Sequence, residues 1–430
     1  MANTHHVVVI GGGFGGLSAT QHLKKAPVQV TLIDRRNFHL FQPLLYQVAT
    51  GWLSPANIAA TLRATLKRHK NTRVLLAEVM GVDVGRRRVL LHNGFVSFDT
   101  LIVAAGSRHH YFGNDHWETL APGLKTVEDA TEIRGRIFSA FEAAERETDP
   151  ERLSALLTFV IVGGGPTGVE LAGALGEIAN DTLKYDFRNI DPSKARILLL
   201  EGGARILPSY SSHLSTQAER SLNGLGVTVQ AHALVTDVKP GAVTVKRGET
   251  LNSIPCHTII WAAGVQASFL GKSIANATGA KLDRSGRIEV EPDLTVKAHP
   301  EILVVGDLAS YRHQTGEPLP GIAPVAIQQG RYAAKLVQRR LSGMSLGPFH
   351  YHDRGNMAII GRASAVADLG KLQFSGFLAW LAWLFVHLMH LVEFENKVLV
   401  LIQWGWYYFS RNRAARIITG GDRTPRLEGS

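Results

Sequence analysis

The stretch HVVVIGGGFGGLSA, residues 6–19, joins an apolar run to a glycine-rich turn and a helical pattern. A second apolar run at residues 28–33 follows and ends at Asp34. The order of strand, glycine turn, helix, strand and acidic residue is the pattern of a dinucleotide-binding βαβ unit. The sequence therefore predicts a nucleotide site at its amino-terminal end.

Each glycine of this turn has a separate physical task. Gly11 makes the tight turn, and Gly13 lets a pyrophosphate approach the backbone. Gly16 lets the helix pack closely on the strand, and the free N–H groups of the helix N-terminus face the phosphates. We expect the carboxylate of Asp34 to accept hydrogen bonds from ribose hydroxyls.

The pattern recurs in LTFVIVGGGPTGVE, residues 157–170, and in a strand at residues 196–200 that ends at Glu201. Its glycines are Gly163, Gly165 and Gly168. Two copies predict two bound dinucleotides. A carboxylate at Glu201 favours the free 2′-hydroxyl of NADH over the 2′-phosphate of NADPH, although Arg205 nearby weakens this preference.

Apolar strands bracket the second copy and define the domain order. Residues 101–106 end in Ala105 and Gly106, residues 259–264 end in Gly264, and residues 302–307 end in an acid. This order predicts an α/β fold with two Rossmann-like dinucleotide-binding domains, in which an NADH domain interrupts an FAD domain. The expected divisions are 1–120 and 266–345 for FAD, 121–265 for NADH, and 346–430 for a carboxy-terminal membrane-associating region.

Composition excludes several other classes of protein. The chain has 430 residues, a formal net charge of +10 and a pI near 9.7, but its basic residues are scattered, which argues against nucleic-acid binding. The single cysteine, Cys256, excludes an internal disulfide and a cysteine-based zinc site, and we expect no metal. No signal peptide is expected, so the protein should stay on the cytoplasmic side where it is made.

The chain resembles the flavoproteins with two dinucleotide-binding domains, whose FAD domain ends in a Gly-Asp pair that matches Gly306-Asp307. Members of that superfamily with catalytic cysteines are excluded by the lone Cys256. The chain is most similar to type II NADH dehydrogenases, which are single-subunit NADH:quinone oxidoreductases. The similar segments are FHLFQPLLY at 38–46, GGGPTGVE at 163–170 and APVAIQ at 323–328.

The resemblance implies roles for particular residues. It places Glu170, Gln328 and Lys397 at the reacting groups, although a helix-dipole role for Glu170 and an interfacial role for Lys397 remain open. The family has glutamine where this chain has Pro324, which fits the first turn of a helix. The residues implied as FAD contacts are Phe14, Gln42, Val79, Ala105, Gly106 and Asp307.

The carboxy-terminal region has the pattern of a membrane-surface segment. Residues 377–392 are apolar on every face apart from two histidines, but 16 residues make only about 24 Å of helix, short of the roughly 30 Å of a bilayer core. Four of the seven tryptophans lie from here to residue 406, and three arginines follow: Arg411, Arg413 and Arg416. We expect a peripheral, monotopic anchor; a homodimer interface and a true span are the alternatives.

Together these features predict hydride transfer from NADH to FAD, followed by reduction of a membrane quinone without proton pumping. Two other functions are compatible with the motifs. One is a soluble NAD(P)H-dependent reductase of the ferredoxin-reductase type, in which the apolar end forms a dimer. The other is a nucleotide-sensing protein that binds both dinucleotides without turnover.

Overall fold

The computed structural model describes residues 4–419, which form two compact units. The first unit contains residues 4–40, 59–108 and 265–353, and the second contains 41–58, 109–264 and 354–419. The second unit therefore interrupts the first in sequence, as an inserted nucleotide domain requires. The predicted fold class, with two Rossmann-like dinucleotide-binding domains, is confirmed.

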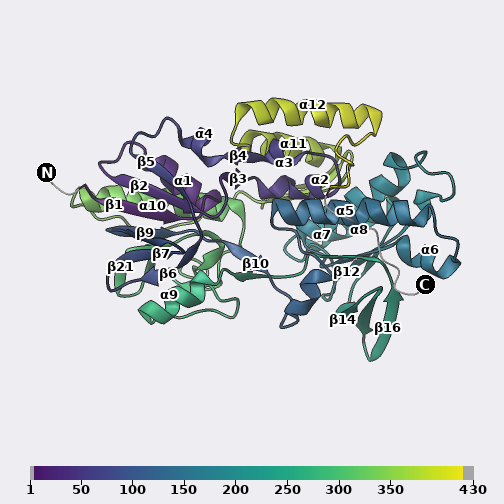
Figure 1. The fold of residues 1–430 in the computed structure, drawn as a ribbon, viewed down its shortest axis with the longest axis horizontal. Coiled ribbons are helices and arrows are strands. Elements are labelled where there is room, and N and C mark those ends of the chain that lie inside the picture. Colours follow the sequence, from purple (N-terminus) through teal and green to yellow (C-terminus); the bar gives the residue numbers. More distant parts are fainter. Residues whose placement is uncertain (1–3, 420–430) are drawn as a thin grey trace. The chain divides into compact units, whose positions relative to one another are not determined.

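The first unit is built on a six-stranded sheet of order β20-β21-β9-β1-β2-β5 (Figure 1). Its strands are Thr295–Val296, His299–Val304, Thr100–Val103, His6–Ile10, Gln29–Asp34 and Thr72–Leu76. Strand β1 pairs in parallel with β2 and with β9, and its central valines are fully buried. Helices and further strands cover both faces of the sheet. The buried strands therefore have continuous apolar sequences instead of alternating ones.

Helices α1, Phe14–His22, and α10, Ala323–Leu341, pack against each other in this unit (Figure 1). Their crossing is unusually close at Gly330, where an added Cβ would lie 2.2 Å from the carbonyl oxygen of Gly15. Pro324 lies in the first turn of α10, as predicted, where its missing N–H has no intrahelical partner to lose. The glycine contact fixes α10 beside the first nucleotide turn.

Shorter elements complete the first unit. They are β3 Phe38–Leu40, β4 Ala59–Thr61, α4 Leu62–Leu66, β6 Val79–Asp83, β7 Arg88–Leu91, β8 Gly94–Ser97, β18 Val265–Ala267, α9 Leu270–Thr278, β19 Ile288–Glu289, η5 Gly306–Leu308 and β22 Ala309–Ser310. Strand β10, Ser107–His109, leads out of this unit and pairs with β18. Helix α9 packs on β6.

The second unit repeats the parallel core in smaller form, with order β13-β12-β11-β17. Its strands are Val227–Gln230, Arg196–Leu200, Thr158–Val162 and Thr258–Trp261. Its helices and turns are η1 Gln42–Leu44, α2 Leu45–Ala49, α3 Pro55–Ile58, η2 Asp115–Thr119, α5 Val127–Ala144, α6 Pro150–Leu156, α7 Pro166–Glu177, η4 Pro192–Lys194 and α8 Ser212–Gly224. Strands β14 Leu234–Lys239, β15 Ala242–Arg247 and β16 Thr250–Pro255 form an antiparallel sheet.

The long interval between the second glycine turn and Glu201 has a structural cause. Helix α7 continues into a π-helical turn, Ile178–Thr182, and an irregular segment follows before β12 begins. Both an extended helix and an irregular segment therefore fill this interval.

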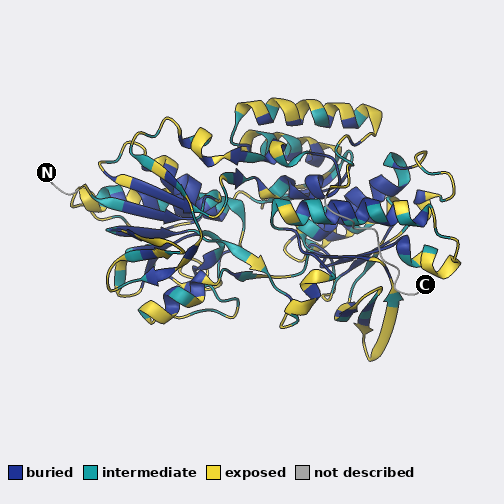
Figure 2. Cartoon of the chain, in the orientation of Figure 1, coloured by how far each residue is buried: buried dark blue, intermediate teal, exposed yellow. Residues whose placement is uncertain are grey.

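The carboxy-terminal region adds an antiparallel sheet and two helices to the second unit. These are β23 Asn356–Gly361, β24 Ser364–Asp368, β25 Gln373–Gly376, α11 Phe377–His390 and α12 Phe394–Ser410. Strand β23 lies on α7, where an added Cβ at Gly173 would be 1.6 Å from the carbonyl oxygen of Ile360. Helix α12 is one continuous helix with a mostly exposed outer face (Figure 2).

A buried ion pair connects the end of the described chain to the core of the second unit. Arg413 is 1% exposed and donates to Glu177 of α7 at 2.8 Å and to the backbone oxygen of Thr50 at 3.1 Å. The Glu177 carboxylate also accepts from the Tyr407 hydroxyl at 2.7 Å and from the Arg362 backbone N–H at 2.5 Å. From the sequence we interpreted Arg413, with Arg411 and Arg416, as part of a membrane-surface segment. That interpretation was wrong for Arg413, because its partner lies 236 positions away and no neighbouring residue indicates it.

We predict that Arg413→Met lowers the free energy of unfolding by about 3–5 kcal/mol, because it leaves the Glu177 carboxylate buried without its cation. Arg411→Met is the matched control. Arg411 is exposed and pairs with Asp181 at 2.8 Å, so its loss should cost about 1 kcal/mol or less. Denaturant titration of both purified variants measures the difference, and equal losses would contradict the assignment.

Candidate functional site

The first glycine turn is held by the carboxylate at the end of β2. Gly11 has φ of +99°, which favours glycine, and its N–H donates to the carbonyl of Ile33 at 2.8 Å. The N–H of Gly12 donates to Oδ2 of Asp34 at 2.5 Å, while Oδ1 accepts from the N–H of Arg36 at 2.7 Å. The predicted ribose acceptor thus also fixes the turn.

The second turn repeats this geometry atom for atom. Gly163 has φ of +108° and donates to the carbonyl of Leu200 at 2.7 Å. The N–H of Gly164 donates to Oε2 of Glu201 at 2.7 Å, and Oε1 accepts from Gly203 at 2.6 Å. A longer acidic side chain at the same place makes the same contact, so both turns present their phosphate-facing N–H groups in one conformation.

The glycines within each turn differ in what surrounds them. A Cβ at Gly16 would lie 1.8 Å from the carbonyl oxygen of Gly11, and one at Gly168 would lie 1.9 Å from that of Gly163. At Gly13, and at the equivalent Gly165, an added Cβ would meet no atom within 4 Å. The protein itself therefore requires the third glycine, whereas the space beside the second is open to a ligand.

The predicted Gly-Asp pair lies on the short turn η5 of the first unit. The Asp307 carboxylate accepts from the Ser107 hydroxyl at 2.5 Å, and the Gly306 N–H donates to Oε1 of Gln329 at 2.7 Å. Gln329 is 1% exposed. The sequence analysis assigned no role to Ser107 or Gln329. The adjacent glutamines 328 and 329 in α10 could have indicated Gln329, but only Gln328 was assigned to the site.

Gln328, the chosen glutamine, pairs with backbone. Its amide nitrogen donates to the carbonyl of His352 at 2.9 Å, and its oxygen accepts from the His352 N–H at 3.0 Å. Lys397 in α12 donates to the carbonyl of Met389 at 2.9 Å, at the carboxy-terminal end of α11. Gln328 belongs to the first unit, and Lys397 to the second.

Glu170, the fifth residue of α7, lies half-buried just beyond the first turn of that helix. Burial raises the pKa of its carboxyl well above the usual value, and a hydrogen bond from the backbone N–H of Ile359 opposes that rise. The effect of the helix dipole falls off within the first turn, so it contributes little to this pKa, and desolvation dominates. A buried carboxyl whose pKa is raised in this way is a candidate for a functional proton donor.

The remaining predicted contacts are spread over both units. Phe14 meets the ring of His39 edge-on at 5.0 Å, and Val79 is buried at the start of β6. Gln42 is exposed and donates to the Lys125 carbonyl at 3.1 Å. The positive-φ glycines Gly106 and Gly264 follow β9 and β17, and Ala105 directly precedes Gly106.

His39, in β3, contacts the first turn, and the sequence analysis assigned it no role. It is 2% exposed, and its Nδ1 lies 2.9 Å from the carbonyl oxygen of Gly12. Burial lowers the pKa of this imidazole, so the ring is neutral at pH 7 and its Nδ1–H donates to that carbonyl. His39 thus contacts the carbonyl of the same glycine whose N–H donates to Asp34.

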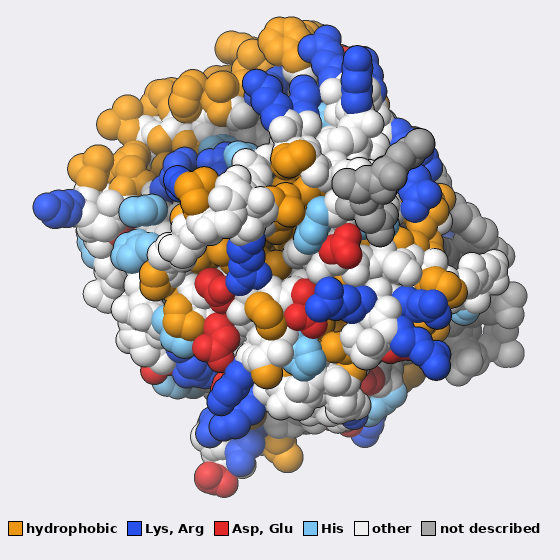
Figure 3. Space-filling model, turned by 90° about the vertical axis from the view of Figure 1, so that its left-hand side faces the viewer, with side chains coloured by type: hydrophobic (Ala, Val, Ile, Leu, Met, Phe, Trp, Pro, Cys, Tyr) orange, Lys and Arg blue, Asp and Glu red, His pale blue; other side chains and the backbone are white. Residues whose placement is uncertain are grey.

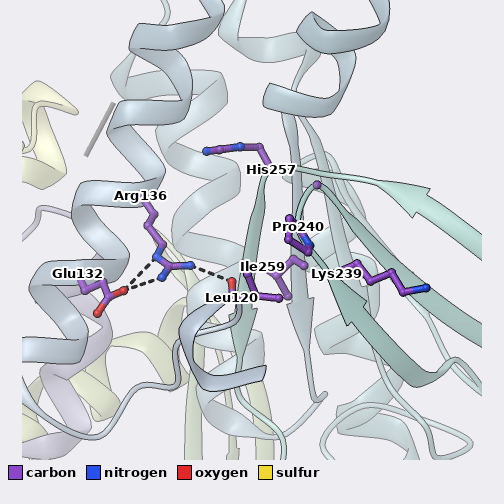
Figure 4. Close-up of a pocket in the computed structure, with 8 residues that line it drawn as sticks. Leu120, Glu132, Arg136, Lys239, Pro240, His257 and Ile259 are labelled. Atoms are coloured by element: carbon purple, nitrogen blue, oxygen red, sulfur yellow. Dashed lines mark hydrogen bonds and ion pairs between the residues drawn. The ribbon is translucent and has the colours of Figure 1, made fainter. Parts of the chain in front are cut away.

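Other features of the chain do not form a competing site. Cys256 is fully buried, and burial raises the pKa of its thiol to about 12, which leaves it protonated. Within residues 4–419 no cluster of side chains could hold a metal ion. A cavity of about 430 Å³ in the second unit is lined by Arg136, Glu132 and their neighbours, none of which belongs to either glycine turn (Figure 4).

Helices α11 and α12 bury one side and expose the other. Trp383, Val400, Trp404 and Tyr407 are buried, at helical spacing. The exposed apolar side chains of the two helices are Phe377, Leu378, Leu381, Phe385, Met389, Phe394, Val398, Leu399, Leu401, Ile402, Trp406 and Phe409. Figure 3 shows hydrophobic side chains gathered along the top of the molecule, with Lys and Arg beside them. Within residues 4–419 no helix has both the length and the apolar character needed to cross a bilayer.

Comparison with known proteins gives matches along most of the chain. The profile of the pyridine nucleotide-disulphide oxidoreductases matches residues 5–330, and that of the NDH2 C-terminal domain matches residues 353–412. The type II NADH:quinone oxidoreductase Ndh of Mycobacterium tuberculosis is 46% identical over 423 residues, which cover 96% of this chain and 90% of that protein.

Two further comparisons agree with these. The type II NADH:quinone oxidoreductase NdhA of the same organism is 48% identical over 427 residues, covering 96% of this chain and 89% of that protein. The structure of NDH2 from Plasmodium falciparum in complex with NADH superposes with a TM-score of 0.87 at 19% identity, covering 97% of this chain and all of that one. The similarity to the Plasmodium falciparum protein shows the fold alone, because the identity is 19%.

We predict that Gly168→Ala lowers the unfolding temperature of the ligand-free protein, because the added methyl would overlap the Gly163 carbonyl; the cost should be about 1–3 kcal/mol or more. Gly165→Ala should leave that temperature within a degree or so, since its Cβ meets open space and its backbone is extended. Calorimetry compares the two. A turn that tolerates alanine equally at both positions would contradict the geometry described.

Proposed function

The chain belongs to the type II NADH:quinone oxidoreductases, within the pyridine nucleotide-disulphide oxidoreductase family. We therefore propose that its two glycine turns bind different dinucleotides. The activity is the oxidation of NADH coupled to the reduction of quinone. The Gly11 turn of the first unit holds FAD, and the Gly163 turn of the second unit holds NADH. The duplicated carboxylate-to-glycine contact is the single observation that carries the proposal of two dinucleotide sites.

The first unit fits FAD on its own geometry. The open space at Gly13 admits the pyrophosphate, and the carboxylate of Asp34 faces the turn. Asp307, which accepts a hydrogen bond from Ser107, is proposed to contact the ribityl or pyrophosphate part of FAD. The other proposed contacts in this unit are Phe14, Val79, Ala105 and Gly106, and Gln42 is a proposed contact from the second unit. When bound, FAD accepts hydride from NADH and passes the electrons to quinone.

The second unit favours NADH over NADPH. The carboxylate of Glu201 is proposed to face the adenosine ribose, where it would repel a 2′-phosphate. Arg205 could offset this repulsion, but its guanidinium donates to the carbonyls of Tyr210 at 2.7 Å and Pro208 at 3.0 Å. Gly165 leaves space for the pyrophosphate, and Gly264 is proposed to contact the nucleotide.

Glu170, Gln328 and Lys397 are proposed to serve quinone reduction. Reduction to quinol takes up two protons, and the raised pKa of the Glu170 carboxyl supports its proposed role as a donor of one of them. Gln328 retains a second N–H and a second oxygen lone pair beyond its contacts with His352, so it can still orient a quinone carbonyl. Lys397 retains donors beyond the one that the Met389 carbonyl accepts.

The exposed apolar side of α11 and α12 is proposed to lie on the cytoplasmic surface of the cell membrane. Trp406 and Phe409 are 67% and 84% exposed, and such side chains partition into the headgroup region. His387 fits this placement, because burial lowers its pKa to about 4 and keeps the imidazole neutral. Quinones stay in the bilayer, so the enzyme must reach them there. A homodimer through the same surface is the alternative occupant, and no nucleic-acid partner is proposed.

The direct test of the proposed function is NADH oxidation by membranes that contain the protein, with a short-chain quinone as acceptor. We expect quinone-dependent oxidation of NADH and a much slower reaction with NADPH. Oxidation that continues without quinone but requires a small redox protein would favour a soluble reductase. Binding of both nucleotides without turnover would favour a sensor.

We predict that Glu201→Gln reduces the ratio of kcat/KM for NADH to that for NADPH by about tenfold, or ~1.4 kcal/mol. The amide keeps one acceptor for the turn but removes the charge that repels the 2′-phosphate. Glu249→Gln, an exposed residue in the β15–β16 turn of the same unit, removes the same charge elsewhere and should leave the ratio unchanged. An unchanged ratio in Glu201→Gln would count against the assignment.

We predict that the double substitution Ile402→Glu and Trp406→Glu moves the protein from the membrane to the soluble fraction, since each lost apolar contact costs about 1.5–3 kcal/mol. Leu251→Glu on β16 is the control, because Leu251 and Ile402 are both 62% exposed. Deleting the whole region would be a poorer test, since Trp383 and Arg413 belong to the core. Continued sedimentation of the double variant with lipid would contradict the anchor.

A further inference from the structure

The buried glutamine of α10, Gln329, has a hydrogen-bond partner at only one end of its amide. Gln329 is 1% exposed, and its Oε1 accepts from the Gly306 N–H at 2.7 Å. A backbone N–H can only donate, so the atom of the amide that faces Gly306 must be the oxygen. In the part of the chain that the structure describes, no acceptor lies within hydrogen-bond distance of the amide nitrogen, Nε2. Two N–H groups of a buried side chain are therefore still available.

The position of Gln329 makes this open end costly for the protein. The other buried residues of α10 are glycine or apolar: Val325, Ala326, Gly330, Ala333, Ala334, Leu336 and Val337. A buried donor without an acceptor loses its hydrogen bonds to water and gains nothing in return, whereas an apolar side chain of the same volume avoids that loss. We therefore expect Nε2 to donate to a group that is not part of the protein chain.

The surroundings of Gln329 indicate which group this is. Ala326, one turn earlier in α10, lies against both motifs of the proposed FAD site. An added Cβ at Gly15 would be 3.4 Å from the Ala326 carbonyl oxygen, and an added Cβ at Gly306 would be 3.4 Å from the Ala326 Cβ. Gly15 belongs to the first turn of α1, where free N–H groups suit a pyrophosphate, and Gly306 opens the Gly-Asp turn η5.

We propose that Gln329 binds FAD: its Nε2 donates to an oxygen of the pyrophosphate or of the adjoining ribityl chain, while its Oε1 holds the Gly306 N–H. This inference rests on the proposed function, in which the first unit holds FAD. Hydrogen bonds to charged acceptors such as phosphate oxygens are the stronger ones. One amide then connects the Gly-Asp turn to the cofactor, so Gln329 adds both affinity and a fixed position for that turn.

The charges around this site also favour an amide at position 329. Asp34 contributes a carboxylate to the glycine turn, and Asp307 contributes one to the Gly-Asp turn. A third carboxylate there would repel the phosphates of FAD, whereas an amide supplies a donor without adding charge. Substitution by glutamate therefore tests the nitrogen of Gln329 separately from its oxygen.

The test is the Kd for FAD, measured by equilibrium dialysis of the flavin-loaded enzyme, with the released flavin followed by its fluorescence. In Gln329→Glu the carboxylate can still accept from Gly306 but cannot donate. We expect its Kd to rise by about tenfold or more at pH 9, relative to the unchanged protein at the same pH. The loss should shrink towards pH 6, because a protonated carboxyl regains one donor.

Gln329→Met keeps the volume of the side chain and removes both contacts. Its Kd for FAD should rise by about tenfold or more at every pH, without the trend seen in Gln329→Glu. Gln338→Met is the matched control on the same helix. Its amide nitrogen donates to the His22 carbonyl at 2.8 Å, so the substitution removes a contact between α10 and α1 away from both turns. We expect the control to change Kd by less than about twofold.

The outcomes separate this inference from the proposed function. If the unchanged protein retains no FAD, the proposed function fails and this inference fails with it. If the unchanged protein retains FAD and Gln329→Met binds it equally well, Gln329 is not a ligand of FAD and the proposed function stands. A Gln329→Glu protein that binds FAD as tightly as the unchanged protein from pH 6 to pH 9 would show that the side chain only holds the turn. An equal loss in Gln338→Met would show that the packing of α10 controls the affinity, which also contradicts the inference.

Discussion

The contact between a glycine N–H and the carboxylate at the end of the neighbouring strand is the interaction on which both proposed nucleotide sites depend. It occurs at Gly12 with Asp34 and again at Gly164 with Glu201. A charge-assisted hydrogen bond of this kind holds a positive-φ glycine turn open at a helix N-terminus. Because the turn is fixed before any ligand arrives, little ordering remains when a pyrophosphate binds.

The parts that sequence could predict are those in which the determining residues are close in the chain. Strands β1 and β12 have the predicted bounds, since each apolar run is cut off by a glycine turn or an acid. The roles of Gly11, Gly16, Gly163 and Gly168 follow from contacts within one βαβ unit. The residues of each turn and the apolar pattern of each strand independently predict the same element, so the prediction is well determined.

The parts that sequence could not predict depend on contacts across hundreds of positions. Ser107 orients Asp307 from 200 positions away, and Arg413 reaches Glu177 from 236. An arginine after an aromatic segment has the same sequence pattern whether it faces lipid or a buried carboxylate. The hydrogen bond between Gln47 and Trp404 could not be predicted either, because the pattern of apolar residues along the chain does not indicate which group a buried amide contacts. The four-part domain division and the roles of Gln328 and Lys397 stay predictions.

The central claim is that one turn holds FAD and the other delivers NADH to it, and anaerobic titration of the purified protein tests it most directly. The account predicts a yellow protein whose flavin absorbance near 450 nm is lost on adding about one equivalent of NADH and returns on adding a short-chain quinone. A protein that is isolated colourless and retains no added flavin, or whose colour NADH does not change, would contradict it.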